Sequence, residues 1–198
     1  MKQAAFASCA IFLAHVFLAP AIEAAEVTPL RLLNAAKEPQ NWLMNHGTYD
    51  AQRYSTLARI DRSSVRNLKM AYATALAGGA PGEHSEATSL VEDGFLYLTD
   101  SWGVLYKIDG RSGDRGRIVW KMDPKQQKQR SARGATFWGS LVITPGNWPA
   151  RMIAVNKDTG QVVWETNLVN GQNETTITAA PLAIGDKIIV GEIGRAHV

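Results

Sequence analysis

Cysteine is almost absent from this chain. Cys9 is the only cysteine among the 198 residues, and it lies in an apolar N-terminal run that we expect to be cleaved off. The mature chain would then have no cysteine, so it can form no disulfide. Zinc-type spacings of cysteine and histidine are also missing, which argues against a structural zinc site.

Other familiar signatures are missing too. The sequence has no glycine-rich phosphate loop and no nucleophile elbow, so it gives no support for a P-loop site or a serine hydrolase. It has no stretch that reads as a helix long enough for a βαβ crossover, which argues against a doubly wound fold. The formal net charge is only +3 and the basic residues are scattered, so we expect no nucleic-acid partner.

Histidine offers one candidate for a metal site. His15 and His197 lie in the apolar N-terminal run and in the last seven residues. His84 lies near Glu83 and Glu86, which could form a metal pair, although a polar histidine in a loop is the commoner interpretation. We therefore assign no metal ligand within this chain.

The first 25 residues have the pattern of a secretory signal peptide. Lys2 precedes an apolar run over residues 4–21, and small residues follow at its end. We expect cleavage near Ala24 or Ala25, which predicts a secreted, periplasmic protein; a retained membrane anchor is the alternative. After cleavage we expect no transmembrane anchor.

Two stretches of the chain nearly repeat one another. Residues 105–113 run on to Trp120, and residues 152–160 run on to Trp164; each reads as a strand, a polar turn ending in glycine, and a second strand closed by tryptophan. The tryptophans are 164 − 120 = 44 residues apart, and a period of roughly 40–50 residues is typical of β-propeller blades. The first copy has three additional residues, 114–116, in its turn, where an insertion leaves the strand register intact.

Short strand patterns continue over residues 86–191, which we take as the propeller blades. The candidate strands are residues 88–91, 95–99, 104–108 and 118–121, then 135–138, 141–144, 152–155 and 162–165, then 176–181 and 187–190. Four strands per period correspond to one blade. The expected fold class is therefore all-β: a β-propeller, present as a fragment of about two and a half blades.

Residues 26–85 form an N-terminal segment before the blades. A weak helical pattern is carried by Leu30, Leu33 and Ala36. Asp61 can cap a short helical turn that continues through Val65 and Leu68, whose apolar side chains are spaced i, i+3.

Residues 192–198 do not continue the blade pattern. They match one reading frame of a common sequencing-library adapter, so we expect a non-native tail; an ordinary C-terminal tail is the alternative. Two and a half blades cannot close a ring without exposing sheet edges, so the chain reads as the opening portion of a longer protein.

One stretch of the N-terminal segment resembles a known enzyme family. It begins at Asn41-Trp42, passes through Gly47, Tyr49 and residues 52–55, and ends with Leu57, Ile60, Val65 and Leu68. This stretch is similar to the N-terminal signature of secreted alcohol dehydrogenases that depend on pyrroloquinoline quinone (PQQ). The Asp/Asn…Gly…Trp repeats resemble the tryptophan-docking motif of the same family. The resemblance covers about residues 41–191. It implies an eight-bladed propeller that binds the quinone in an axial funnel beside a metal ion, usually calcium.

The resemblance also implies an activity. Family members oxidise an alcohol, polyol or sugar by hydride transfer to the quinone, with an aspartate as general base, and pass the electrons to a cytochrome c or a membrane quinone. The family's metal-ligating glutamate and catalytic aspartate would lie beyond residue 191. No catalytic residue and no metal ligand is therefore assigned here, and Glu192 is not taken as one.

Three residues match family positions that contact the quinone. Glu86 lies seven residues before the Asp-Gly turn at residues 93–94, Arg133 precedes Gly134, and Thr178 opens the stretch 178–181. The quinone carries three carboxylates, so its site needs guanidinium and hydroxyl donors. The alternatives are a solvated Glu86, an Arg133 paired with a surface acid, and an ordinary strand residue at Thr178.

Trp120 and Trp164 are expected to pack between blades rather than stack on the quinone, because a tryptophan at a repeat position serves every blade equally.

One departure from the family pattern bears on the subgroup. Most alcohol-oxidising members carry adjacent cysteines five and six residues before the arginine, where this chain has Lys128 and Gln127. This departure argues against the methanol and ethanol subgroups.

A non-catalytic propeller that scaffolds outer-membrane protein assembly is the alternative function. It would share the repeats and the signal peptide. It would give no reason to place Glu86 and Arg133 where inner strands start, and the signature over residues 42–68 also argues against it.

Overall fold

The computed structural model describes residues 25–77, 84–130, 132–168 and 176–191. The expected signal peptide up to residue 24, Glu83 and the expected tail at 192–198 lie outside these described residues. Within the described part of the chain, no helix is both long enough and apolar enough to cross a membrane.

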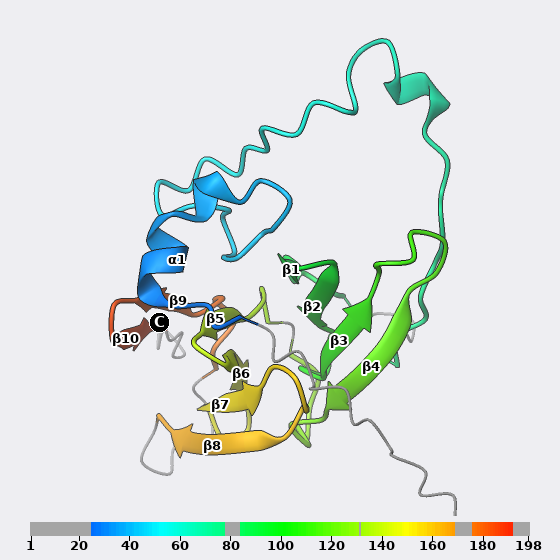
Figure 1. Cartoon of the computed structure of the whole chain (residues 1–198). Helices are drawn as coiled ribbons and strands as arrows, with labels where there is room; N and C mark the ends of the chain where they lie inside the picture. Colours follow the sequence, from blue (N-terminus) through cyan, green and yellow to red (C-terminus); the bar gives the residue numbers. More distant parts are fainter. Residues whose placement is uncertain (1–24, 78–83, 131, 169–175, 192–198) are drawn as a thin grey trace, which may run out of the picture.

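The chain forms two complete blades and the start of a third. The first sheet has the order β1 (Leu90–Glu92), β2 (Phe95–Thr99), β3 (Leu105–Asp109) and β4 (Arg117–Met122). The second has β5 (Thr136–Trp138), β6 (Leu141–Gly146), β7 (Arg151–Asn156) and β8 (Val162–Asn167), and the third has β9 (Leu182–Ile184) and β10 (Lys187–Ile189). All neighbours are antiparallel. The three sheets follow one another along a curve, and their first strands, β1, β5 and β9, lie on its inner side (Figure 1). An all-β propeller fragment of about two and a half blades is thereby confirmed.

The two complete blades repeat each other in detail. Each has the same irregularity between its third and fourth strands. Lys107 and Ile108 of β3 pair with Trp120 and Ile118 of β4, and Ala154 and Val155 of β7 pair with Trp164 and Val162 of β8. These positions are equivalent in the two sequence repeats, and a bulge of this kind increases the local twist of a sheet. The additional residues 114–116 lie in the turn between β3 and β4, outside both strands.

Trp120 lies between the two complete blades. Its indole Nε1 donates a hydrogen bond to the carbonyl oxygen of Lys157 at 3.2 Å. Its ring covers Gly160, where an added Cβ would stand 2.7 Å from ring atoms. Trp164 packs against a separate apolar cluster that includes Ile143 and Met152. Both tryptophans therefore occupy packing positions, as expected.

The main core lies between the first two blades. The ring of Tyr97 meets the ring of Phe137 edge to face, with centroids 5.0 Å apart. Such pairs add to the stabilisation that burial itself gives. The buried residues around them come from both blades and the N-terminal segment and include Val27, Leu43, Leu90, Leu105, Val142 and Ile153.

The N-terminal segment contains the expected helix, but the face that carries Leu30 and Leu33 is exposed rather than buried. Helix α1 (Pro29–Leu33) is capped by the Thr28 hydroxyl and is followed by a 3-10 turn, η1 (Ala35–Lys37). Leu30 and Leu33 are 68% and 70% exposed, whereas Leu32 is buried. A five-residue helix is too short for its periodicity to fix its orientation, and the contacts of Arg31 determine which side faces the blades.

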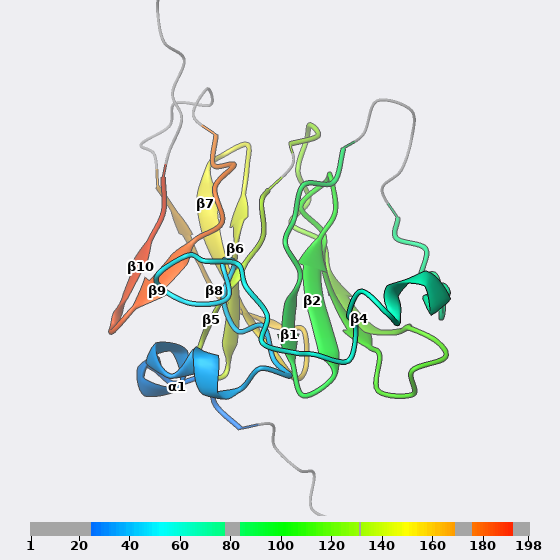
Figure 2. The ribbon, with the colours of Figure 1, turned by 90° about the horizontal axis from the view of Figure 1, so that it is seen from above.

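A buried ionic cluster joins the N-terminal segment to both blades. The carboxylate of Glu92, 2% exposed, accepts from Arg31 Nη1 at 2.6 Å and from Lys157 Nζ at 2.7 Å. The ammonium of Lys157 is fully buried and also donates to the Ala25 carbonyl at 2.8 Å. Buried charges are tolerated when they are paired and hydrogen-bonded in this way. Figure 2 shows α1 at one end of the blades.

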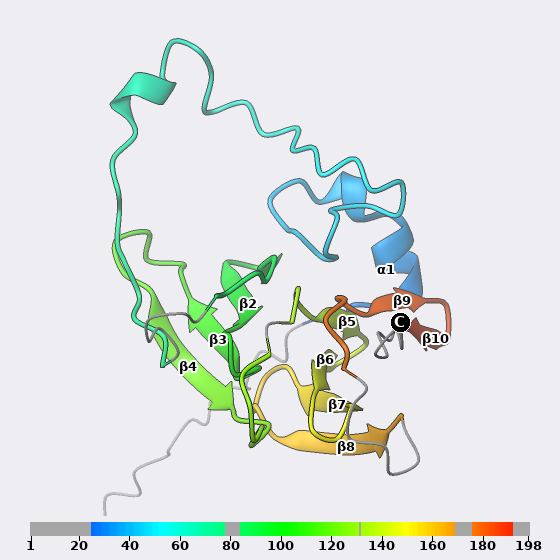
Figure 3. The same ribbon diagram turned by 180° about the vertical axis from the view of Figure 1, so that it is seen from behind.

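Residues 56–70 form a wide arc that leaves the blades (Figures 1 and 3). Asp61 caps a short turn, as expected: its carboxylate accepts from the Ser63 hydroxyl and from the backbone N–H groups of Ser63 and Ser64. The 3-10 turn η2 (Val65–Asn67) follows, with Ser64 at its N-cap position. These hydrogen bonds, that of the Ser63 hydroxyl first, lower the pKa of Asp61 to about 2.

The chain then returns to the outer face of the first blade. The backbone N–H of Ala77 donates to the Tyr106 hydroxyl at 3.1 Å. Leu76 packs against the apolar cluster that contains Tyr106 and Ile108. The arc is therefore anchored to the blades again at its C-terminal side.

The prediction that residues 176–181 form the first strand of the third blade is wrong. Strand β9 begins only at Leu182. The backbone N–H and C=O of Ile177 pair with the side-chain amide of Asn147, at 2.8 and 3.2 Å. Pro181 has no N–H to offer a neighbouring strand. The segment is therefore held by a side chain of the second blade.

Candidate cofactor site

Glu86, Arg133 and Thr178 occupy equivalent places in three successive blades. Each lies shortly before the first strand of its blade: four residues before β1, three before β5 and four before β9. They therefore precede the inner strands, whereas the sequence placed them at the strand starts. The strands β1, β5 and β9 line the inner side of the curve that the three blades form (Figure 1). The segments that carry Glu86, Arg133 and Thr178 therefore converge on that inner side.

The three side chains are in contact. Arg133 Nη1 donates to the Thr178 hydroxyl at 2.9 Å, and Arg133 Nη2 lies 3.4 Å from Glu86 Oε2. The side chains of Arg133 and Glu86 are 55% and 48% exposed, while Thr178 is nearly buried. The result is an accessible guanidinium whose orientation is set by a hydroxyl on one side and a carboxylate on the other.

Backbone hydrogen bonds fix the frame around Arg133. Its N–H donates to the Thr178 carbonyl at 2.9 Å, and its own carbonyl accepts from the N–H of Thr88 at 3.1 Å. The Asn45 side chain donates to the same carbonyl at 2.9 Å. Three blades and the N-terminal segment therefore meet at one residue.

Gly134 permits this close approach. Its φ is +136°, and an added Cβ would stand 3.0 Å from the Thr88 carbonyl oxygen and 3.1 Å from Asn45 Nδ2. A side chain here would meet backbone that cannot move away, and the φ value itself favours glycine.

A second arginine reaches the site from the N-terminal segment. Arg53 Nη2 donates to the Thr88 hydroxyl at 3.3 Å, and Arg53 Nη1 lies 3.3 Å from His46 Nδ1. Asn45, His46 and Arg53 were not expected at the site. The signal that could have found them is that all three lie in the stretch that carries the family resemblance.

The donor set fits an anionic ligand better than a metal ion. Among the described residues, no group of three or more His, Cys, Asp or Glu side chains comes together. A guanidinium fork beside a hydroxyl is suited to a carboxylate, which it can bind through two parallel hydrogen bonds. The suggested pairing of His84 with Glu83 cannot be placed, because Glu83 lies outside the described residues.

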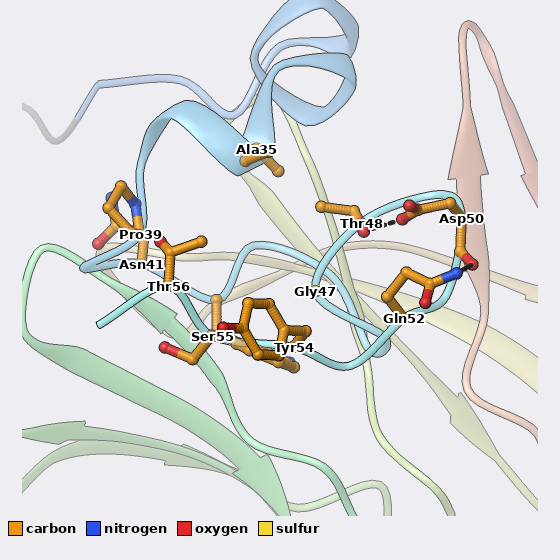
Figure 4. A pocket seen from close by; sticks show the side chains of 12 residues that line it. Ala35, Pro39, Asn41, Gly47, Thr48, Asp50, Gln52, Tyr54, Ser55 and Thr56 are labelled. Atoms are coloured by element: carbon orange, nitrogen blue, oxygen red, sulfur yellow. Dashed lines mark hydrogen bonds between the residues drawn. The ribbon is translucent and has the colours of Figure 1, made fainter. Parts of the chain in front are cut away.

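A separate hollow of about 200 Å³ lies within the N-terminal segment (Figure 4). Its lining includes apolar Ala35, Pro39 and Trp42 and polar Thr48, Asp50 and Gln52. The Thr48 hydroxyl donates to the Asp50 carboxylate. The lining contains none of the three expected cofactor residues and no cation, so this hollow is a poor match for a ligand that carries carboxylates.

The chain is similar to known quinone-dependent dehydrogenases. Residues 42–194 match the family model "PQQ: Glucose/ethanol/alcohol dehydrogenase, beta-propeller domain". The quinohemoprotein alcohol dehydrogenase ADH-IIG of Pseudomonas putida is 34% identical over 181 residues, covering 86% of this chain and 24% of that protein. The dehydrogenase subunit of the alcohol dehydrogenase (quinone) of Komagataeibacter europaeus is 30% identical over 199 residues, covering 93% of this chain and 26% of that protein.

A solved structure shows the same likeness. The structure of ADHIIG from Pseudomonas putida HK5 superposes with a TM-score of 0.76 at 32% identity, covering 88% of this chain and 26% of that chain. The chain spans about a quarter of the length of the curated relatives it matches. The resemblance drawn from the signature and the repeats is confirmed: this chain belongs to the glucose/ethanol/alcohol dehydrogenase family of PQQ β-propellers.

Proposed function

We propose that this chain supplies the N-terminal blades of a periplasmic quinoprotein dehydrogenase that oxidises an alcohol, polyol or sugar. The observation that carries the proposal is the convergence of Glu86, Arg133 and Thr178 from three blades on one accessible point. The periplasmic location is supported by the signal-peptide pattern of the first 25 residues. The family membership supports the reaction class.

Each of the three residues has a distinct task in this proposal. Arg133 would bind a carboxylate of the cofactor through its guanidinium fork. Thr178 already accepts a hydrogen bond from Arg133, so its own O–H remains to donate to a ligand. Glu86 balances the charge of Arg133 and holds its orientation. Pyrroloquinoline quinone, when bound, supplies the hydride acceptor.

The remaining parts of the enzyme would come from outside this chain. A calcium or another metal ion and the aspartate base would be held by residues beyond 191. A cytochrome c or a membrane quinone would accept the electrons. A non-catalytic scaffold of outer-membrane assembly, the alternative, gives no reason for a guanidinium, a carboxylate and a hydroxyl to converge at one accessible point.

Titration of the complete apo-protein with quinone tests the proposal. Hydrogen bonds to charged groups contribute about 1.5–3 kcal/mol, so Arg133→Ala should weaken quinone binding about tenfold to a hundredfold. Arg133→Lys should recover only part of the loss, because a point charge cannot reproduce the fork. Arg115→Ala is the control, since Arg115 is 81% exposed and its ion pair is with Asp114, which is 76% exposed. Unchanged affinity together with a lowered melting temperature would make Arg133 a structural residue.

A further inference from the structure

The loop that leads into β5 carries several cations with few counter-charges. It contains Asp123, Lys125, Lys128, Arg130 and Arg133. Lys125 pairs with Asp123 at 2.9 Å, and Arg133 pairs with Glu86. Within the described part of the chain, no carboxylate lies within ion-pair distance of Lys128 or Arg130. Among the described residues, these two cations therefore have no counter-charge.

Arg130 and Arg133 reach the same side of one segment. Arg130 Nη2 donates to the Thr176 hydroxyl at 3.2 Å, and Arg133 Nη1 donates to the Thr178 hydroxyl at 2.9 Å. Side chains two residues apart in an extended chain share a face and lie roughly 7 Å apart. The two guanidinium groups are therefore placed one after the other along this segment. Arg130 lies at the position farther from β9.

The loop is held in place from several directions. The backbone N–H of Arg130 donates to the Ser101 carbonyl at 3.1 Å. Gln126 Oε1 accepts from the N–H of Asn147 at 2.9 Å, and the Asn147 amide pairs with the backbone of Ile177. In Figure 2 the yellow-green loop before β5 and the turn between β6 and β7 lie at the same end of the blades, opposite α1. The position of Arg130 is thus set by both neighbouring blades.

Much of the hydrogen-bonding capacity of Arg130 is unused. A guanidinium has five N–H donors, and in the described part of the chain only Nη2 of Arg130 has a partner, Thr176. Lys128, two residues earlier, lies over the ring of Trp148 with its Nζ 5.9 Å from the ring centroid.

We propose that Arg130, assisted by the charge of Lys128, recognises an acidic group on the substrate, so that the enzyme prefers alcohols that carry a carboxylate. This inference rests on the proposed function, in which Arg133 is occupied by the quinone. Arg130 is exposed and lies next to Arg133 along the segment 176–178. In the described part of the chain Arg130 uses only Nη2, so its other donors are open to a ligand.

The test compares glycerate with glycerol, which differ by a carboxylate in place of one alcohol group. In the complete protein loaded with quinone and metal ion, kcat/KM should be higher for glycerate. Arg130→Gln should lower the glycerate-to-glycerol ratio about tenfold, which corresponds to about 1.4 kcal/mol. Arg130→Lys should retain part of the preference. The preference should weaken at high salt, because the site is open to solvent.

A binding measurement accompanies the kinetics. Malonate, an anion with no alcohol to oxidise, should bind the wild-type protein and bind Arg130→Gln about tenfold more weakly. Arg115→Gln should leave both the ratio and the malonate affinity unchanged.

Four outcomes would overturn the inference. An unchanged ratio in Arg130→Gln removes it directly. Weaker quinone binding in Arg130→Gln would make Arg130 a cofactor contact instead. A rate that falls only with a protein electron acceptor, and not with a small dye, would assign the loop to acceptor docking. A wild-type protein that binds no quinone would remove the proposed function, and this inference with it.

Discussion

At the scale of single residues, Gly113 and Gly160 allow a matched comparison between the two blades. They are equivalent in the two repeats and have nearly the same φ, +75° and +76°. An added Cβ at Gly113 would meet nothing within 4 Å, whereas at Gly160 it would lie 2.7 Å from the Trp120 ring. The difference between them therefore isolates the contact between the blades from the conformational preference of glycine.

We expect Gly160→Ala to destabilise the protein more than Gly113→Ala. Both variants force alanine into a left-handed conformation, at a cost of roughly 1 kcal/mol. Gly160→Ala must also displace Trp120, and overpacking typically costs a further 1–3 kcal/mol or so. Urea unfolding of both variants, with and without Trp120→Ala, measures the difference. Equal destabilisation by the two alanines would show that Trp120 does not pack tightly on Gly160.

The candidate site was only partly predictable at this scale. The sequence resemblance identified Glu86, Arg133 and Thr178, and the structure brings them together. It missed Asn45 because the side chain acts on a carbonyl 88 residues away, which no local pattern encodes. Gly134 was noted only as a neighbour of Arg133, since its need for no side chain depends on Thr88 from another blade.

At the scale of elements, the buried cluster of Arg31, Glu92 and Lys157 determines how α1 docks. Glu92→Gln should destabilise the protein by about 3–5 kcal/mol, because it leaves the fully buried ammonium of Lys157 without its counter-charge. The double variant Glu92→Leu with Lys157→Met should be much less destabilised, since it removes both charges together. Chemical denaturation measures both. A double variant as unstable as the single one would contradict this account.

The ion pair of Arg31 with Glu38 predicts a pH dependence. The hydrogen bond from Arg31 is the main reason that the pKa of Glu38 lies below its ordinary 4.5. A carboxyl with a lowered pKa in the folded state stabilises that state above its unfolded pKa and loses this effect as the pH falls through the folded value. We therefore expect Glu38→Gln to be less stable than wild type at pH 7. The difference in unfolding free energy should shrink below about pH 4.5; a constant difference down to pH 2 would contradict it.

The elements themselves were largely predictable, and their exceptions have physical causes. The eight strands of the first two blades come from short apolar runs separated by turns, and they form within a few residues of their expected bounds. The strand expected at 176–181 does not form because Asn147 takes the backbone hydrogen bonds of Ile177. The buried side of α1 was missed because it depends on Arg31 reaching Glu92, 61 residues away.

At the scale of the whole molecule, the arc at residues 56–70 is the described segment that packs least against the rest of the chain. Its apolar side chains are exposed: Leu57 is 60%, Ile60 59%, Leu68 58% and Met70 83% accessible. We expect trypsin to cut this chain first within residues 53–69, where the accessible sites are Arg53, Arg59, Arg62, Arg66 and Lys69. Mass spectrometry of early fragments would show this. First cleavage at Lys107 or Lys157, both buried in the blades, would contradict it.

The hydrogen bond between Lys157 and the Ala25 carbonyl has a consequence for timing. The two residues are 132 positions apart, and at about 5–20 residues per second a ribosome needs on the order of ten seconds to make the chain between them. Until the second blade exists, the first described residues have no partner for this contact, and closing so long a loop carries an entropic cost. The segment that begins at Ala25 is therefore among the last of the described parts to dock, and it stays accessible to proteases while the blades behind it are still being made.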